Sequence, residues 1–124
     1  MKKIIILFII FLSLHLGLMA ANIDDGNKLL KDCLHAEKVM NGDRTANLTQ
    51  ASFCIGLISG VSSTMQIMGE DHPKIKICPP EKIPNNEQLV RITLNFLKKN
   101  PQRLHQGDNI LVMMALIREF PCKK

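Results

Sequence analysis

The sequence predicts an all-α fold, a small disulfide-stapled helical bundle of about four main helices arranged as two helical hairpins. Apolar residues recur at spacings of three and four along four segments, which is the period of an amphipathic helix. No segment alternates apolar and polar residues as a half-buried strand would. The chain also holds four cysteines, an even number in only 124 residues, which is typical of a small exported protein with two disulfides.

Residues 1–21, "MKKIIILFIIFLSLHLGLMAA", have the composition of a signal peptide. Lys2 and Lys3 precede an apolar run, and Ala20 and Ala21 form a small-residue cleavage site. A transmembrane anchor is the alternative, because the apolar stretch reaches about 18 residues. The Ala-Ala end favours cleavage, and the residue directly after it is Asn22, not a cysteine that could carry a lipid. We therefore expect a soluble periplasmic domain of residues 22–124, free of the membrane once the signal is removed.

The charge of that domain gives no support to nucleic-acid binding. Without Lys2 and Lys3 the chain keeps 14 basic and 11 acidic residues, and the basic ones are scattered. Trp and Tyr are absent, so aromatic platforms for stacking bases are scarce. We expect no nucleic-acid partner.

The first two helices are predicted from "DDGNKLLKDCLHAEKVMNGD" and "NLTQASFCIGLISGVSSTMQIMGED". The first is expected to be capped by Asp24 or Asp25 and to end before Gly42, and the second to be capped by Asn47 or Thr49 and to end near Gly69. Their apolar faces are Leu29, Cys33, Ala36 and Met40 in the first, and Ala51, Cys54, Ile58, Val61, Met65 and Met68 in the second.

Two glycines interrupt the second helix. Gly56 and Gly60 lower helix propensity, so we expect them to permit the close approach of a neighbouring helix. The sequon Asn47-Leu-Thr49 falls where a helix cap is needed, and the cap is the favoured interpretation.

The segment "DHPKIKICPPEKIPNN" contains four of the six prolines and is predicted to be an irregular connector. A third helix follows Asn85 or Asn86 and ends at "KKNP". A fourth runs from Asp108, which can cap it, to the break at Pro121, with a short extra turn at about 102–106. The third helix should bury Leu89, Ile92, Thr93, Phe96 and Leu97.

The helix order favours one of the three possible cysteine pairings. Cys33 and Cys54 lie at similar distances on either side of Arg44, so they are level in an antiparallel hairpin that turns there. Cys78 precedes the third helix and Cys122 follows the fourth, so a second hairpin brings them to one end. We therefore predict disulfides Cys33–Cys54 and Cys78–Cys122. A metal site is not expected, because there is no C-x-x-C and the histidines do not fall in zinc-ligand pairs.

The sequence offers no arrangement of catalytic residues. No serine lies in a nucleophile elbow, and the carboxylates are dispersed. The pair Glu70 and Asp71 fits a solvated loop better than a catalytic acid, and His72 beside Pro73 fits a surface histidine. We expect a protein that is not an enzyme and has no cofactor.

Four blocks of the sequence resemble one protein family. "GNKLLKDC", "CIGLISGV", "CPPEKI...EQLVRITLNFLKKNPQRLH" and "LVMMALIREFPC" together resemble the Rap/Tai type of type VI secretion amidase immunity proteins, over residues 26–122. The resemblance implies a small, exported, helical, disulfide-bonded protein. It also implies binding to a peptidoglycan amidase effector in the periplasm, with its active site blocked, often by a dimeric inhibitor.

An inhibitor of this kind needs exposed polar groups on a rigid base. The stretch Gly69 to Lys76 is the best candidate, with Glu70, Asp71, His72 and Lys74 to engage a Cys–His active site and Gln66 as a flanking contact. A helix face at Ser59 to Ser63 is the alternative surface. The alternative function is a small periplasmic stress or acid-resistance chaperone of the disulfide-bonded helical type. The modest charge and high apolar content of the chain weigh against it.

Overall fold

The computed structural model describes residues 24–80 and 84–122 of the 124. These residues form α2 (Gly26–Met40), α3 (Leu48–Met68), α4 (Asn86–Lys99) and α5 (Asp108–Glu119), with the 3₁₀ turns η2 (Pro73–Ile75) and η3 (Pro101–Arg103). The predicted all-α fold is confirmed. The predicted signal peptide, residues 1–21, lies outside the described residues.

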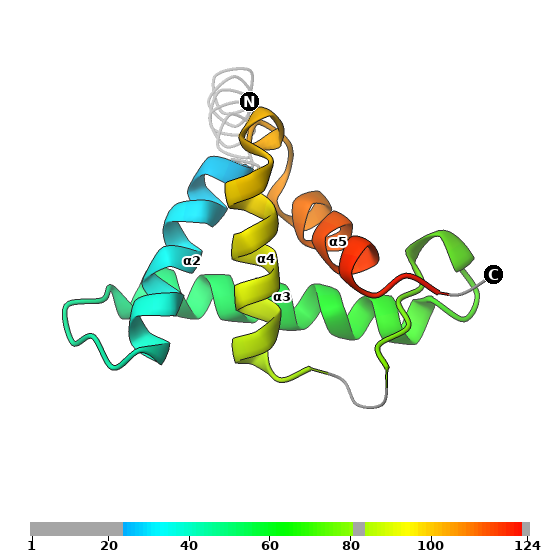
Figure 1. Cartoon of the computed structure of the whole chain (residues 1–124), viewed down its shortest axis with the longest axis horizontal. Helices are drawn as coiled ribbons and strands as arrows, with labels where there is room; N and C mark the ends of the chain where they lie inside the picture. Colours follow the sequence, from blue (N-terminus) through cyan, green and yellow to red (C-terminus); the bar gives the residue numbers. More distant parts are fainter. Residues whose placement is uncertain (1–23, 81–83, 123–124) are drawn as a thin grey trace, which may run out of the picture.

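Helix α3 is the longest element, and α2, α4 and α5 all pack against it (Figure 1). The consecutive pairs α2–α3 and α4–α5 are in contact, and α2 also packs on α4. The core lies where these helices meet. Its largest fully buried apolar side chains are Leu29, Ile58, Met65, Leu94, Leu97, Leu111 and Leu116.

The predicted face of α3 extends too far towards its C-terminus. Ala51, Cys54, Ile58 and Met65 are buried as expected, but Met68 is 44% exposed. The reason is visible in Figure 1, where the end of α3 runs past the other helices. A side chain there has no helix to pack against.

The helix starts follow the capping residues of the sequence, with one exception. Asp25 caps α2 by accepting the N–H groups of Asn27 and Lys28 at 3.0 and 3.1 Å, and Asn47 caps α3 by accepting that of Gln50. The prediction that Asp108 caps α5 is wrong, because Gly107 is the N-cap and Asp108 is the first helical residue.

The exception at Asp108 has a tertiary cause. Asp25 and Gly107 form an antiparallel bridge, in which Gly26 N–H donates to Gln106 O at 3.0 Å and Asp108 N–H donates to Asp24 O at 3.1 Å. The entries to α2 and α5 are therefore joined through their backbones. That pairing fixes where α5 begins.

Helix α4 begins with a capping box. Asn85 Oδ1 accepts from Gln88 N–H at 2.9 Å, and Gln88 Oε1 accepts from Asn85 N–H at 3.1 Å. Asn85→Ala is expected to lower the free energy of unfolding by about 1 kcal/mol, because the N–H group of Gln88 loses its acceptor. Urea unfolding checks this, with Asn86→Ala, one residue later and outside the box, as the matched control. Equal losses in the two variants would contradict the capping role.

A buried carboxylate lies on α2. Asp32 is fully buried, and its Oδ2 accepts from Lys28 Nζ at 2.7 Å. The Lys28 ammonium also lies 3.2 Å from Asp24 Oδ2 and 3.9 Å from the centre of the Phe53 ring. Asp32 Oδ1 makes no hydrogen bond within the described part of the chain. Lys28 is therefore the group that compensates the buried charge.

The two disulfides join the pairs predicted from the helix order. Cys33 on α2 bonds Cys54 on α3, and both residues are fully buried. Cys78 in the connector bonds Cys122 after α5, and Cys78 is exposed. One disulfide therefore lies inside the core, and the other holds the connector to the C-terminal segment.

Candidate functional site

Residues 69–76, called here the 69–76 loop, project beyond the end of α3 (Figure 1). Gly69 caps the helix, with its N–H donating to Met65 O at 2.9 Å. A Cβ added to Gly69 would lie 2.5 Å from Met65 O and 3.0 Å from Lys76 Cα. Only glycine therefore lets the two ends of the loop come so close.

The loop is held at several points along its backbone. The N–H groups of Asp71 and His72 both donate to Met68 O, at 3.2 and 2.9 Å, and η2 gives the loop one further turn. Lys76 Nζ pairs with Glu70 Oε1 at 2.8 Å across its base. The segment is therefore an ordered projection with its own hydrogen bonds.

The end of the loop is attached to the bundle. Ile77 is only 8% exposed and belongs to the core. The next residue, Cys78, donates its N–H to Phe120 O at 3.0 Å and is bonded to Cys122. These contacts give the loop a rigid base, which is the property that a side chain inserted into a partner's cleft requires.

The structure brings together four of the five predicted partner-binding residues. Glu70, Asp71, His72 and Lys74 are all exposed on the 69–76 loop. Gln66 lies apart from them, half-buried on α3, and its Nε2 donates to the buried Ser62 Oγ at 3.2 Å. Its amide is thus already engaged inside the molecule.

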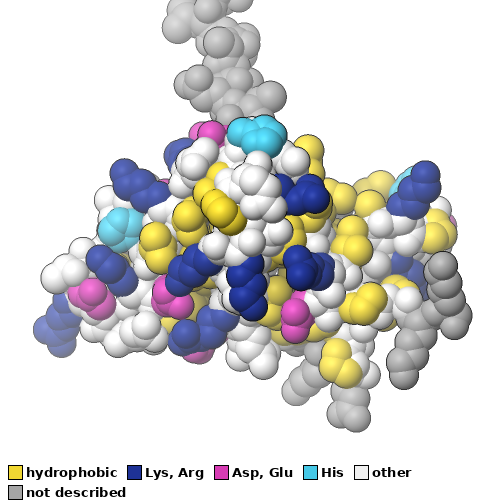
Figure 2. Space-filling view, turned by 45° about the horizontal axis from the view of Figure 1, so that its top comes forward, with side chains coloured by type: hydrophobic (Ala, Val, Ile, Leu, Met, Phe, Trp, Pro, Cys, Tyr) yellow, Lys and Arg dark blue, Asp and Glu magenta, His cyan; other side chains and the backbone are white. Residues whose placement is uncertain are grey.

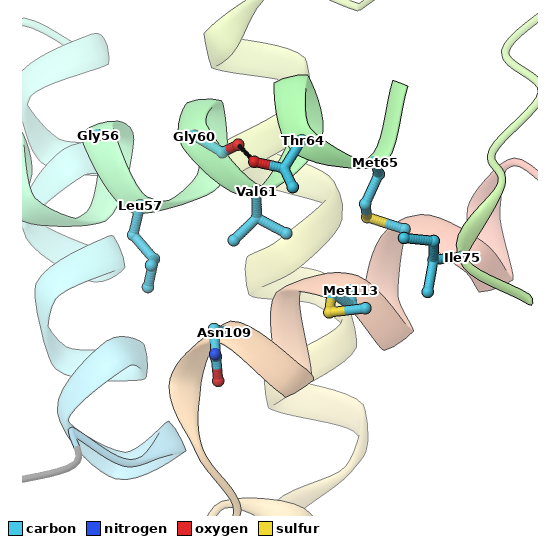
Figure 3. Close-up of a pocket in the computed structure, with 9 residues that line it drawn as sticks. All are labelled: Gly56, Leu57, Gly60, Val61, Thr64, Met65, Ile75, Asn109 and Met113. Carbon is cyan, nitrogen blue, oxygen red and sulfur yellow. Dashed lines mark hydrogen bonds between the residues drawn. The ribbon is translucent and has the colours of Figure 1, made fainter. Parts of the chain in front are cut away.

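A groove of about 420 Å³ lies between α3, η2 and α5 (Figure 3), and the sequence did not predict it. Leu57, Val61, Ile75 and Met113 give it an apolar lining. Gly56 and Gly60 form part of its edge on α3. The groove is open to solvent.

The expectation that Gly56 and Gly60 admit a neighbouring helix of the same bundle is wrong. Both glycines are exposed, and a Cβ built on either one meets nothing within 4 Å. The reason is that α3 meets the bundle through a different face. That face consists of Ala51, Cys54, Ile58, Ser62 and Met65.

On the face of the molecule shown in Figure 2, basic and acidic side chains are interspersed and form no patch of a single charge. Several are paired, as when Arg91 contacts Glu87 at 2.9 Å and Lys98 contacts Glu37 at 3.4 Å. Such exposed pairs contribute little to stability but give a solvated surface. Over the described ranges, no three His, Cys, Asp or Glu side chains are grouped so that they could hold a metal ion.

The fold and the loop together define a small, all-helical, disulfide-bonded protein that presents polar side chains on a rigid projection. A family model of the Rap1a immunity proteins matches residues 25–122, and the chain belongs to that family. The family resemblance of the sequence blocks is thereby confirmed. Membership supports an immunity role, in which the protein binds a cognate effector. No curated protein and no solved structure matches the chain.

Proposed function

We propose that this chain is a periplasmic immunity protein that binds a type VI secretion peptidoglycan amidase effector and blocks its active site with the 69–76 loop. The observation that carries the proposal is the projecting loop with its fixed base, in a chain of the Rap1a immunity family. Inhibitors that insert a preformed loop lose little conformational entropy on binding.

The side chains of the loop fit the chemistry of a Cys–His site. A carboxylate can accept a hydrogen bond from the imidazolium of such a site, and a histidine can hydrogen-bond to the groups around the thiolate. Glu70 is held by Lys76 at the base, which leaves Asp71 and His72 further along the loop. Neither of these side chains makes a hydrogen bond or ion pair to another described residue. Both are therefore available to a partner.

The periplasm is the compartment that this proposal assigns. Two disulfides require an oxidising environment to form and persist, and the N-terminal sequence has the pattern of a cleaved export signal. A homodimer, implied by the resemblance of the sequence blocks, is also part of the proposal.

The test is protection of cells that express the cognate periplasmic amidase. The variant Glu70→Ala with Asp71→Ala and His72→Ala is expected to abolish protection and to weaken effector binding more than about tenfold, because the contacts made only by the loop are removed. The matched control replaces three exposed residues of α2 and α4, Lys31, Asn95 and Lys99, with alanine.

Both triple variants should retain the helical circular dichroism of the wild type. Calorimetric titration with the purified effector then separates binding from folding. Full protection by the folded loop variant would exclude the loop as the blocking element. A wild-type chain that protects against no amidase encoded near its own gene would overturn the immunity proposal itself.

A further inference from the structure

The two disulfides differ in how closely a reductant can approach them. Cys33 and Cys54 are 0% exposed and join α2 to α3 inside the core. Cys78 is exposed and Cys122 is half-buried, and both lie outside the helices. A thiolate must reach a sulfur atom directly to break a disulfide, so burial protects a bond from reduction. In the folded protein, Cys78–Cys122 is therefore the bond that a reductant reaches first.

Prolines limit the hydrogen bonding of the backbone around this exposed bond. The N–H of Cys78 donates to Phe120 O at 3.0 Å. Pro79, Pro80 and Pro121 stand next to the two cysteines and have no N–H group, so they cannot extend that pairing as donors. A segment of this kind opens locally at a lower free energy than the helices of a packed core. A reductant can therefore approach without unfolding the bundle.

The exposed bond lies at one end of the 69–76 loop. The loop runs directly into Ile77 and Cys78, and the disulfide joins that point to the segment after α5. The ion pair of Lys76 with Glu70 joins two residues of the loop itself and does not attach it to the bundle. Breaking the disulfide therefore removes the covalent attachment at this end of the loop, while the buried disulfide still joins α2 to α3.

We propose that the Cys78–Cys122 disulfide is a redox switch for the 69–76 loop. A protein dithiol reduces it in the folded state, the loop loses its fixed base, and the effector is bound more weakly. The inference rests on the proposed function for the role of the loop and adds a means of controlling it.

The reduction is a two-step thiol–disulfide exchange. A thiolate of the reductant attacks Sγ of Cys78, which breaks the bond to Cys122, forms a mixed disulfide and releases Cys122 as a thiolate. The second thiol of the reductant then attacks the mixed disulfide and releases Cys78. The protein gains two electrons and two protons, and the reductant is oxidised to its own disulfide.

The fold favours closing the bond again. Ile77, next to Cys78, and Phe120, two residues before Cys122, are 8% and 9% exposed and belong to the core. They keep the two thiols close together after reduction, and thiols tethered in this way have a high effective concentration. The bacterial periplasm is kept oxidising by enzymes rather than by a thiol buffer. The state of the exposed bond there follows the supply of oxidising and reducing dithiol proteins.

The first test is the order in which the bonds of the effector-free protein are reduced. Dithiothreitol is added, samples are stopped with N-ethylmaleimide, and the labelled peptides are identified by mass spectrometry. Cys78 and Cys122 are expected to be labelled at least about tenfold faster than Cys33 and Cys54, because the latter pair is buried. In urea that unfolds the chain, the two bonds should react at similar rates.

Three outcomes of this test would overturn the switch. The first is equal labelling of both pairs, or earlier labelling of Cys33 and Cys54, in the folded protein. The second is a preference that persists in urea, since burial would then not be its cause. The third is loss of the helical circular dichroism when Cys78–Cys122 alone is reduced, which would make the bond a staple of the fold.

The second test compares effector affinity in the two states. Protein reduced only at Cys78–Cys122 is capped with iodoacetamide, freed of reductant and titrated calorimetrically with the effector. Its Kd should be at least about tenfold weaker than that of the oxidised protein, because the loop must then be ordered on binding. Reoxidation of uncapped protein should restore the affinity. Cys78→Ser with Cys122→Ser is the matched control, and its weak binding should not change after treatment with dithiothreitol.

Failure of the switch is distinguishable from failure of the proposed function. If selective reduction leaves the affinity unchanged while Glu70→Ala with Asp71→Ala and His72→Ala loses it, the switch is wrong and the loop still blocks the effector. If the oxidised loop variant keeps full affinity, the loop is not the blocking element and both proposals are wrong.

Discussion

Replacing Cys78 and Cys122 with serine is expected to lower the free energy of unfolding by about 4 kcal/mol and to abolish protection by the 69–76 loop. The Cys78–Cys122 disulfide joins residues that are 44 apart in the sequence, and the chain-entropy model gives a stabilisation of about 4 kcal/mol for a loop of that length. It also holds the connector to the segment after α5. Without it, the base of the loop is attached to the bundle through the packing of Ile77 and the backbone hydrogen bond from Cys78 to Phe120.

The other disulfide supplies the matched control. Cys33→Ala with Cys54→Ala removes the disulfide between residues that are 21 apart in the sequence. The same model gives a loss of about 3 kcal/mol in the free energy of unfolding for a loop of that length. That loss is similar, but the bond lies between α2 and α3 and does not touch the loop.

Denaturant unfolding measures the two losses, and hydrogen exchange of the amides of residues 69–78 measures the order of the loop. Faster exchange of these amides in the Cys78/Cys122 variant alone, under conditions where both variants are folded, is the expected result. Equal exchange in the two variants would contradict the role of Cys78–Cys122 as the anchor of the loop.

The second large effect is expected at Lys28. Lys28→Met leaves the carboxylate of Asp32 buried without its cation, and we expect a loss of about 2 kcal/mol at pH 7. This is less than the ~3–5 kcal/mol that breaking a fully buried pair costs, because the Lys28 side chain is 46% exposed. Adding Asp32→Leu should recover most of the loss, since the uncompensated charge is then gone. Lys31→Met, at an exposed position on the same helix, is the control for loss of charge alone.

The dependence on pH follows from the ion pair. The hydrogen bond to Asp32, opposed by desolvation and aided by Asp24, raises the pKa of Lys28 above its ordinary value of 10.5. The folded state binds the proton of the Lys28 ammonium more tightly than the unfolded state does. The stabilisation by the ion pair is therefore fully present below pH 10.5 and is lost as the pH rises through the raised pKa. The difference in the free energy of unfolding between wild type and Lys28→Met should therefore be constant from pH 7 to 9 and shrink above pH 10.5. A difference that grows with pH would contradict this assignment.

The sequence predicted the helices because local rules decide them. Asp25, Asn47 and Asn85 have side chains that accept the first N–H groups of a helix, and each caps the helix that its position indicated. Asp108 has the same chemistry but does not act as a cap, because the backbone of the neighbouring Gly107 is paired with Asp25. Pairing between distant segments is not encoded in a capping pattern.

Tertiary contacts also explain what sequence reasoning could not predict about the surfaces. Proline content and polar residues located the 69–76 loop, but nothing local shows that Gln66 turns towards Ser62 or that Glu70 pairs with Lys76. Gly56 and Gly60 looked like a contact inside the bundle because spacing alone does not tell which side of an apolar helix is covered.

The order of the cysteines has a consequence for the export into the periplasm proposed above. The two disulfides join consecutive cysteines, the first with the second and the third with the fourth, so their covalent loops follow one another without overlapping. A chain that crosses a membrane with its N-terminus first can close the earlier loop as soon as Cys54 emerges, while the later half is still in transit. The earlier pair is also the closest in sequence, at a separation of 21 residues, so its loop costs the least entropy to close. Oxidation in order of emergence therefore yields the native bonds directly, without a step that breaks and reshuffles a wrong one.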